Sequence, residues 1–309
     1  MTAPTPMLKL GTRRSPLAMA QAEEARARLC AAHGWREEQV ELVPVTASGD
    51  RIQDRPLAEI GGKALWTKEL DAWLLAGEID FAVHSLKDVE TIRPAGIAIA
   101  AILPREDVRD VLVGAASIHA LPRGARVGTS APRRAAQLLH ARPDCTVVPF
   151  RGNVATRLAK LQAGEADATL LALAGLNRLG QHGVGHPLDA EDWLPAPGQG
   201  AIAIECRAGD EAVRALLAAI NDTPSHAAVT AERALLAALG GNCHSPIAVL
   251  TRAEGPALVM EAALFSPDGA ERVAGEIRFA AGDDAAPGRL ADDLLARAVP
   301  AIAVHFTGR

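Results

Sequence analysis

In the first two-thirds of the chain, short apolar runs with β-strand character alternate with segments of helical periodicity. This alternation is typical of βαβ units and predicts an α/β fold. The predicted strands are residues 8–11, 40–45, 79–84, 97–102, 111–113, 126–128, 146–149 and 168–171. The predicted helices are residues 16–32, 66–76, 132–141, 154–163 and 212–220.

Two strand-to-helix junctions in this region have similar sequences. Residues 11–16 and residues 128–134 each lead from a predicted strand through Thr and Ser into a helix with Pro near its start. Ser at the N-cap and Pro in the first turn both favour the start of a helix. We interpret the similarity as a sign of two related α/β lobes.

The alternation breaks near Pro104 and again at residues 194–200, and one further strand is predicted at 201–206. A strand at that place indicates that the chain returns to the first lobe, which would give two hinge crossings and a cleft. The pattern then changes to a helix, three strands and a helix, typical of a small α+β domain. The predicted segments are helix 225–239, strands 247–251, 257–265 and 271–279, and helix 289–299. The predicted domains are residues 1–103 with 199–219, residues 104–198, and residues 220–309.

Composition excludes several classes of protein. The formal net charge of −5 argues against general nucleic-acid affinity, which needs a basic surface. We find no apolar run long enough for a membrane span and no signal-peptide pattern at the start. The four cysteines are scattered without a Cys-x-x-Cys pair, so we expect a reducing cytoplasm and no metal site.

Arginines stand at three predicted helix starts, where a positive charge opposes the helix dipole. Residues that break a local rule concentrate at functional sites, so we expect an anionic ligand bound by backbone N–H groups and guanidinium groups. In a two-lobe α/β protein, such a ligand would lie in the cleft at the carboxyl ends of the strands. These residues are Arg13 and Arg14, Arg133 and Arg134, and Arg151 and Arg157.

Two further segments carry polar residues whose role the residue pattern leaves open. Residues 79–84 form a buried strand that runs into Ser85, Lys87 and Asp88, and Asp88 fits either a capping residue or a catalytic acid. His84, at the end of that strand, is expected to be a packed core residue. Cys243 lies in a Gly-containing loop, and without other information a structural cysteine is the favoured interpretation.

Taken in order, these segments resemble the porphobilinogen deaminase family over essentially the whole chain. The segments that carry the resemblance are residues 12–18, 61–63, 82–88, 128–130 with Arg133 and Arg134, 151–154, 174–180, 197–200 and the loop around Cys243. The resemblance implies two periplasmic-binding-protein-like lobes with a hinge and a cleft, and a small third domain of α+β type. It also implies a cytoplasmic, monomeric transferase of tetrapyrrole and haem biosynthesis.

The family joins four porphobilinogen molecules head to tail, with loss of ammonia, and releases hydroxymethylbilane. The resemblance implies a dipyrromethane cofactor attached by a thioether to Cys243, which reverses the interpretation of that residue. It assigns catalysis to Asp88, Lys87 and Arg13. Cofactor binding is assigned to Cys243, Ser15, Ser85, Lys87, Asp88, Thr129, Ser130, Arg133, Arg134, Arg151 and Arg157. Substrate binding is assigned to Arg13, Ser15, Lys63, Arg151, Arg157, Arg178 and Gln199, and Ser85 is placed close to the incoming pyrrole.

Some positions depart from the pattern of the family, and two other functions fit part of the sequence. Lys63 is expected on a loop, residues 48–65, that covers the cleft, where Ala64 and Trp66 are departures. The other departures are Ala131, Pro132 and Asn242. A solute-binding or effector-binding module would share the lobes and the anion cleft, but would have no use for Cys243. An enzyme with Lys87 as a Schiff-base nucleophile would form a lysine adduct that borohydride traps.

Overall fold

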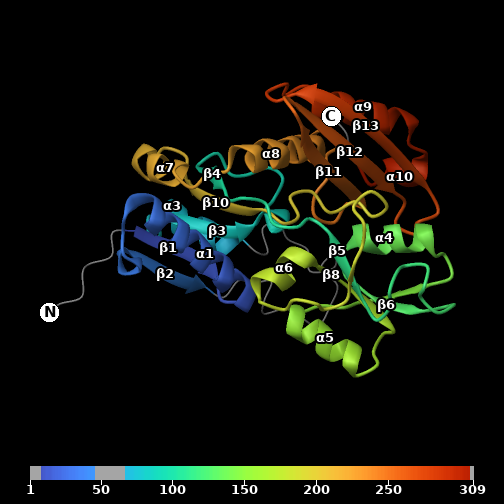
Figure 1. Ribbon diagram of the computed structural model, residues 1–309. Coiled ribbons are helices and arrows are strands. Elements are labelled where there is room, and N and C mark those ends of the chain that lie inside the picture. The colour runs from blue at the N-terminus through green and yellow to red at the C-terminus, as the bar shows by residue number, and fades with distance from the viewer. Residues whose placement is uncertain (1–7, 46–66, 307–309) are drawn as a thin grey trace. The chain divides into compact units, whose positions relative to one another are not determined.

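The computed structural model describes residues 8–45 and 67–306 and contains three β-sheets (Figure 1). The strand orders are β2-β1-β3-β10-β4, β7-β6-β8-β5-β9 and β11-β12-β13. The chain separates into two compact units, one with the described residues up to 106 and residues 200–226, the other with residues 107–199 and 227–306. The expected α/β fold of two sheet lobes and a small third sheet domain is confirmed. The domain boundaries stay a prediction.

The first sheet is mixed. Its strands are β1 (Leu8–Arg13), β2 (Val40–Val45), β3 (Phe81–Ser85), β4 (Ile97–Ile102) and β10 (Ile202–Arg207). Strand β1 runs parallel to β2 and β3, whereas β10 runs antiparallel to β3 and β4. Strand β10 therefore returns to the first sheet, as predicted for the segment after residue 200.

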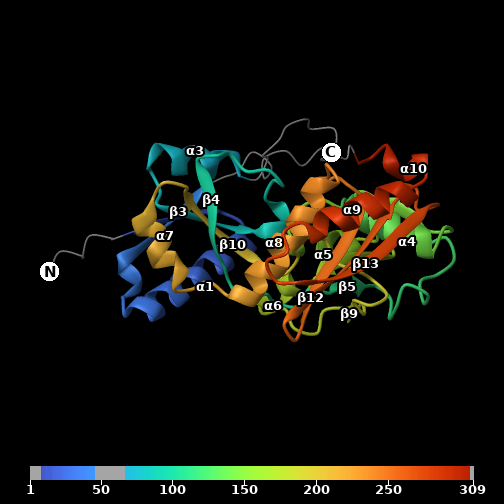
Figure 2. The same cartoon turned by 90° about the horizontal axis from the view of Figure 1, so that it is seen from above.

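Helices cover both faces of this sheet (Figure 2). They are α1 (Pro16–His33), α7 (Glu211–Ala218) and α3 (Lys68–Ala76), and short 3-10 turns are formed by η1 (Glu37–Gln39) and η3 (Leu86–Asp88). Phe81 and Val83 pack in one cluster with α1 and α7, whereas Ala82 packs with α3. This alternation follows from the two-residue period of a strand.

The second sheet belongs to the other unit. Its strands are β5 (Asp110–Val113), β6 (Arg126–Gly128), β7 (Thr146–Val148), β8 (Ala168–Ala172) and β9 (His186–Pro187), with helices α4 (Pro132–Ala141), α5 (Val154–Gln162) and α6 (Leu173–Arg178). Gly128 ends β6 where a Cβ would fall 2.4 Å from the Phe150 ring, so a side chain there would displace that ring. The short elements α6 and β9 were not predicted, because neither is long enough to show a period.

The third sheet follows helix α8 (Thr223–Ala238). It comprises β11 (Ile247–Glu254), β12 (Ala257–Phe265) and β13 (Arg272–Ala280), followed by α9 (Ala286–Arg297) and α10 (Pro300–Ala303). One core cluster joins this sheet to α8 and α9, and a second joins Ala248, Leu250 and Phe265 to Ala136 of α4. Within this unit, buried Glu232 of α8 accepts N–H hydrogen bonds from Gly198 (2.7 Å) and Thr251 (2.9 Å).

Most predicted elements are present with small changes at their ends. The segments 40–45, 97–102, 126–128, 132–141 and 257–265 have the predicted bounds, whereas strand 79–84 is shifted to Phe81–Ser85. Lys63, Ala64, Trp66 and the expected loop 48–65 lie outside the described residues. No described helix has both the length and the apolar character needed to span a bilayer.

Candidate functional site

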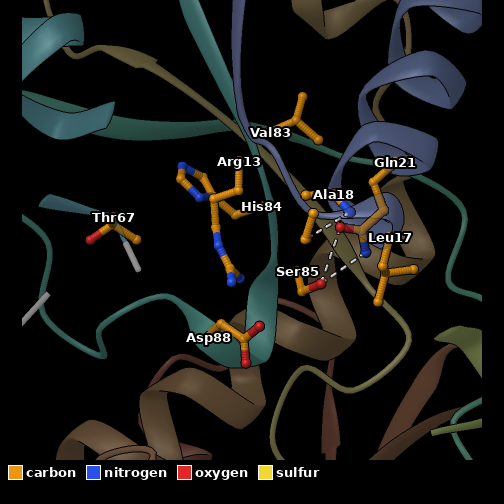
Figure 3. A pocket seen from close by; sticks show the side chains of 10 residues that line it. Arg13, Leu17, Ala18, Gln21, Thr67, Val83, His84, Ser85 and Asp88 are labelled. Carbon is orange, nitrogen blue, oxygen red and sulfur yellow. Dashed lines mark hydrogen bonds between the residues drawn. The ribbon is translucent and has the colours of Figure 1, made fainter. Parts of the chain in front are cut away.

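A pocket in the first unit opens where β1, β3 and the start of α1 come together (Figure 3). Strands β1 and β3 are parallel neighbours, so their carboxyl ends lie at the same edge of the sheet. Arg13 ends β1, Ser85 ends β3, and the turn η3 then brings Asp88 to the same place. The lining residues are Arg13, Ser15, Leu17, Ala18, Gln21, Thr67, Val83, His84, Ser85 and Asp88.

The structure thus gathers four of the predicted site residues, Arg13, Ser15, Ser85 and Asp88. The Arg13 side chain extends toward the Asp88 carboxylate (Figure 3). Lys87 is half-buried on the same turn as Asp88 but does not line the pocket. These four residues bring a cation, two hydroxyls and a carboxylate to the pocket.

Hydroxyl groups in the pocket are held by helix α1. Ser15 is the N-cap of α1, and its Oγ accepts a hydrogen bond from the Ala18 N–H at 3.4 Å. Gln21, which is 3% exposed, has its Nε2 2.8 Å and its Oε1 3.1 Å from Ser85 Oγ. The carboxamide can therefore either donate to Ser85 or accept from it. Gln21 was not predicted as a site residue, because one glutamine on a helix gives no periodic signal.

His84 is buried as expected, but it also lines the pocket, which the sequence analysis did not predict. Its Nε2 lies 3.3 Å from Glu205 Oε2, without the alignment of a hydrogen bond. Burial, followed by the positive charge of Arg93, lowers the pKa of His84 to about 4. Its imidazole is therefore neutral at physiological pH. Thr67, also on the pocket wall, is another residue that the sequence analysis missed.

In the second unit, one buried carboxylate organises the arginines at the start of α4. Asp110 accepts hydrogen bonds from Arg133 Nη2 at 2.8 Å and from Arg134 Nη2 at 2.6 Å. It also accepts from Trp193 Nε1 at 2.9 Å and from Gln199 Nε2 at 2.8 Å. Burial alone would raise the pKa of Asp110, but the two guanidinium groups hold it well below its usual range.

The anion expected at this helix start is therefore supplied by the protein itself. Arg133 and Arg134 are each 5% exposed, and they also donate to the carbonyls of Leu194 and Leu170, respectively. We inferred an external anionic ligand from the position of Arg133 and Arg134, but with Asp110 in place their position does not require one. Their assignment to cofactor binding stays a prediction. If it is right, the ligand and Asp110 would bind the same guanidinium groups.

Apart from Cys243, the other predicted residues of this unit lie near the starts of α4 and α5 or at the end of α6. Ser130 donates to the Phe150 carbonyl at 2.9 Å, and Arg157 Nε donates to the Gly152 carbonyl at 3.0 Å. Thr129 is buried, whereas Arg151, Arg157 and Arg178 are half-buried. Gly152 has φ +104°, and a Cβ there would meet Thr156 at 2.8 Å or less, so the turn before α5 favours glycine.

Cys243 lies in the loop between α8 and β11. Asn242 and Ser245 shape this loop, because Asn242 N–H donates to Ser245 Oγ at 3.0 Å and His244 N–H donates to Asn242 Oδ1 at 2.8 Å. Cys243 is exposed, whereas Cys30, Cys145 and Cys206 are buried. Burial raises the pKa of all three buried thiols. Of the four cysteines, Cys243 is thus the one accessible to an electrophile in solution.

Comparison with known proteins gives consistent matches along the chain. Residues 8–215 match the family model described as porphobilinogen deaminase, dipyromethane cofactor binding domain, and residues 226–295 match the porphobilinogen deaminase C-terminal domain. Among solved structures, a putative methionine-binding lipoprotein of Bacillus subtilis aligns with a TM-score of 0.42 at 13% identity, over 71% of this chain and 91% of its own.

Curated relatives are much more similar in sequence. A porphobilinogen deaminase of Sphingopyxis alaskensis is 58% identical over 98% of this chain and 97% of its own length. The porphobilinogen deaminase of Paracoccus denitrificans is 51% identical over 96% of each chain. Together with the family models, this similarity shows that the chain belongs to the porphobilinogen deaminase family.

Proposed function

We propose that Asp88 is the carboxylate that handles protons while this enzyme joins four porphobilinogen molecules, and that Cys243 anchors its dipyrromethane cofactor. Membership of the family establishes the transferase activity and the cofactor. The assignment of residues rests chiefly on one observation. The Asp88 pocket places a carboxylate, a guanidinium group and two hydroxyls at the ends of adjacent strands.

The pocket suits the chemistry of porphobilinogen, a pyrrole with an acetate, a propionate and an aminomethyl group. Arg13 and the hydroxyls of Ser15 and Ser85 would bind a carboxylate of the substrate. Asp88 would accept the pyrrole N–H hydrogen bond and stabilise the positive charge that develops as the C–N bond to the departing ammonia breaks. Asp88 can also hold and release a proton during the reaction.

The residues around Cys243 fit a covalently attached cofactor. A thioether needs an accessible sulfur, and Cys243 is the exposed cysteine among the four. When bound, the dipyrromethane supplies the pyrrole carbon to which the first new bond is made. The chain supplies the anchoring Sγ in one unit and the Asp88 carboxylate in the other.

Most of the remaining predicted residues would bind carboxylates, of which every added ring brings two. This role is proposed for the half-buried Arg151 and Arg157 at the start of α5, where backbone N–H groups also favour anions. The same role is proposed for Lys87, Thr129, Ser130, Arg133 and Arg134. Arg178 and Gln199 are proposed to lie close to the incoming pyrrole, and Lys63 is proposed to contact the substrate. A cytoplasmic location and a monomeric state follow from the resemblance and belong to the same proposal.

Intact-protein mass spectrometry tests the anchor directly. We expect the wild-type protein to be heavier than its sequence by two linked pyrrole units, and Cys243→Ser to have its sequence mass. Cys30→Ser, a change at a buried cysteine, should retain the added mass. A Cys243→Ser protein that still carries the pyrroles would refute the assignment. A wild type with no added mass even after incubation with porphobilinogen would refute the proposed function.

A further inference from the structure

A buried ionic cluster around Arg93 adjoins the Asp88 pocket. Arg93 Nε and Nη2 each lie 2.8 Å from a carboxylate oxygen of Glu205. Its Nη1 and Nη2 bond both oxygens of Asp71, at 3.1 and 2.5 Å, and Nη1 also bonds Glu90 Oε2 at 2.6 Å. The five N–H groups of a guanidinium are thereby all used on three carboxylates. The side chain of Arg93 is 8% exposed and that of Glu205 is 0% exposed.

Two of these carboxylates extend the cluster to the wall of the pocket. Glu90 Oε2 accepts a hydrogen bond from Thr67 Oγ1 at 2.8 Å, and Glu205 Oε2 lies 3.3 Å from His84 Nε2. Thr67 and His84 both line the pocket. Arg93 itself does not line it, so its influence on a bound substrate would be indirect.

We propose that Arg93 is a positioning residue for the Asp88 pocket, because it fixes Glu90, which accepts the Thr67 hydrogen bond, and Glu205, whose charge lies beside His84. The inference rests on the proposed function, since its catalytic consequence is measured with porphobilinogen. Nothing in the five donor contacts requires a ligand, and the arrangement is complete within the first unit.

The charges around His84 indicate how the loss of Arg93 would change the protonation of its imidazole. Three carboxylates share one guanidinium group, so the cluster already has an excess of negative charge. His84 is also influenced by Arg13, which lowers its pKa, and by Asp71 and Asp88, which raise it. Without Arg93, Glu205 would be unpaired beside His84, and an adjacent negative charge favours the imidazolium form.

The variant Arg93→Gln tests this arrangement, with Arg214→Gln as the matched control. Arg214 forms an exposed ion pair with Glu211 in the same unit. Two quantities are followed in the holoenzyme: the pH profile of kcat/KM with porphobilinogen, and the NMR titration of the His84 ring, assigned with His84→Asn. For Arg93→Gln we expect the His84 midpoint to rise by about one unit or more, which corresponds to about a tenfold change in the protonation equilibrium.

We also expect the acidic limb in the pH profile of kcat/KM to move up with the His84 midpoint in Arg93→Gln, so that kcat/KM falls about tenfold one pH unit below the new midpoint and changes little near pH 8. This limb should disappear in the double variant Arg93→Gln/His84→Asn, and Arg214→Gln should behave as the wild type. A purely structural role would lower thermal stability but leave both the limb and the His84 midpoint unchanged at temperatures where the variant is folded. That result would overturn the proposal.

Arg93→Lys keeps the inference testable if Arg93→Gln does not fold. Lysine keeps the positive charge but has three N–H donors in place of five, so it cannot form all five contacts that Arg93 makes with the three carboxylates. We expect a smaller rise of the His84 midpoint and a smaller acidic loss of kcat/KM, and wild-type values for both would overturn the proposal. The NMR midpoint does not depend on turnover, so absence of activity in the wild type would refute the proposed function without deciding this inference.

Discussion

At the scale of single residues, the acid–base role proposed for Asp88 agrees with its position on the pocket wall. It lies at the edge where two parallel strands end, and Arg13 points toward it (Figure 3). An asparagine in its place keeps the shape but cannot carry the negative charge or accept a proton. The function of the site should therefore be separable from its folding.

For Asp88→Asn we expect wild-type thermal stability and a loss of turnover of several orders of magnitude, because a preorganised charge near the reacting atoms is worth about 10²- to 10³-fold and proton transfer a further factor. Steady-state kinetics with porphobilinogen measures the effect. Asp210→Asn in the same unit is the control, since Asn and Asp are nearly equivalent at the N-cap that Asp210 occupies. Near-normal turnover of Asp88→Asn would contradict the assignment.

A second residue-scale prediction concerns stability at acidic pH. His84 has a pKa of about 4 in the folded protein and an ordinary value of 6.5, so the unfolded chain binds the extra proton between these limits. The free energy of unfolding should therefore fall as the pH decreases from about 6.5 to about 4, by at most roughly 3 kcal/mol from this group. Urea unfolding at several pH values should show a shallower decline for His84→Asn than for the wild type. Equal declines would contradict the prediction.

Only part of the pocket could be predicted from the sequence, and there is a physical reason why the other residues could not. Ser85 and Asp88 follow a buried strand, and such polar residues at strand ends are expected at a site. Gln21 lies on the buried face of a helix and His84 on a buried strand, where a polar side chain looks like any other buried residue. Their partners, Ser85 and Glu205, become visible only when the order of the strands is known.

At the scale of elements, Asp110 joins three parts of the second unit. It begins β5, and its carboxylate binds the start of α4 through Arg133 and Arg134 and the segment 193–199 through Trp193 and Gln199. The sequence showed the unfavourable cations at the helix start but could not show this partner, because the pairing crosses from β5 to α4. The arginines at this helix start do need a negative charge beside them, as the sequence indicated, but the protein supplies it through Asp110.

The variant Asp110→Asn should lose about 3–5 kcal/mol of unfolding free energy, because two buried guanidinium groups would lose their counter-charge. Asp107→Asn, three residues earlier, is the matched control. Asp107 forms a more exposed ion pair with Arg109, and such pairs contribute about 0–1 kcal/mol. Chemical denaturation of both variants gives the comparison, and similar losses would show that Asp110 does not organise the unit.

At the scale of the whole molecule, the residues proposed for one reaction are distributed over both units. The Asp88 pocket belongs to one unit, and Cys243 with Arg151 and Arg157 belongs to the other. Each added pyrrole brings two further carboxylates while the anchor stays the same. The demand for cations therefore grows with every cycle, and residues that bind these carboxylates should matter more in late cycles than in the first.

Arg151→Ala and Arg157→Ala should therefore slow the later additions of pyrrole more than the first. We expect both variants to keep the cofactor but to accumulate protein species heavier by one or more whole pyrrole units, with slow release of product, because each lost guanidinium–carboxylate pair weakens later additions by about 1.5–3 kcal/mol. Intact-protein mass spectrometry after brief incubation with porphobilinogen resolves these species. Arg126→Ala removes a more exposed arginine of the same unit and should give the wild-type distribution. If all three variants gave that distribution, Arg151 and Arg157 would not bind the growing chain, and its carboxylates would have to be neutralised by other cations.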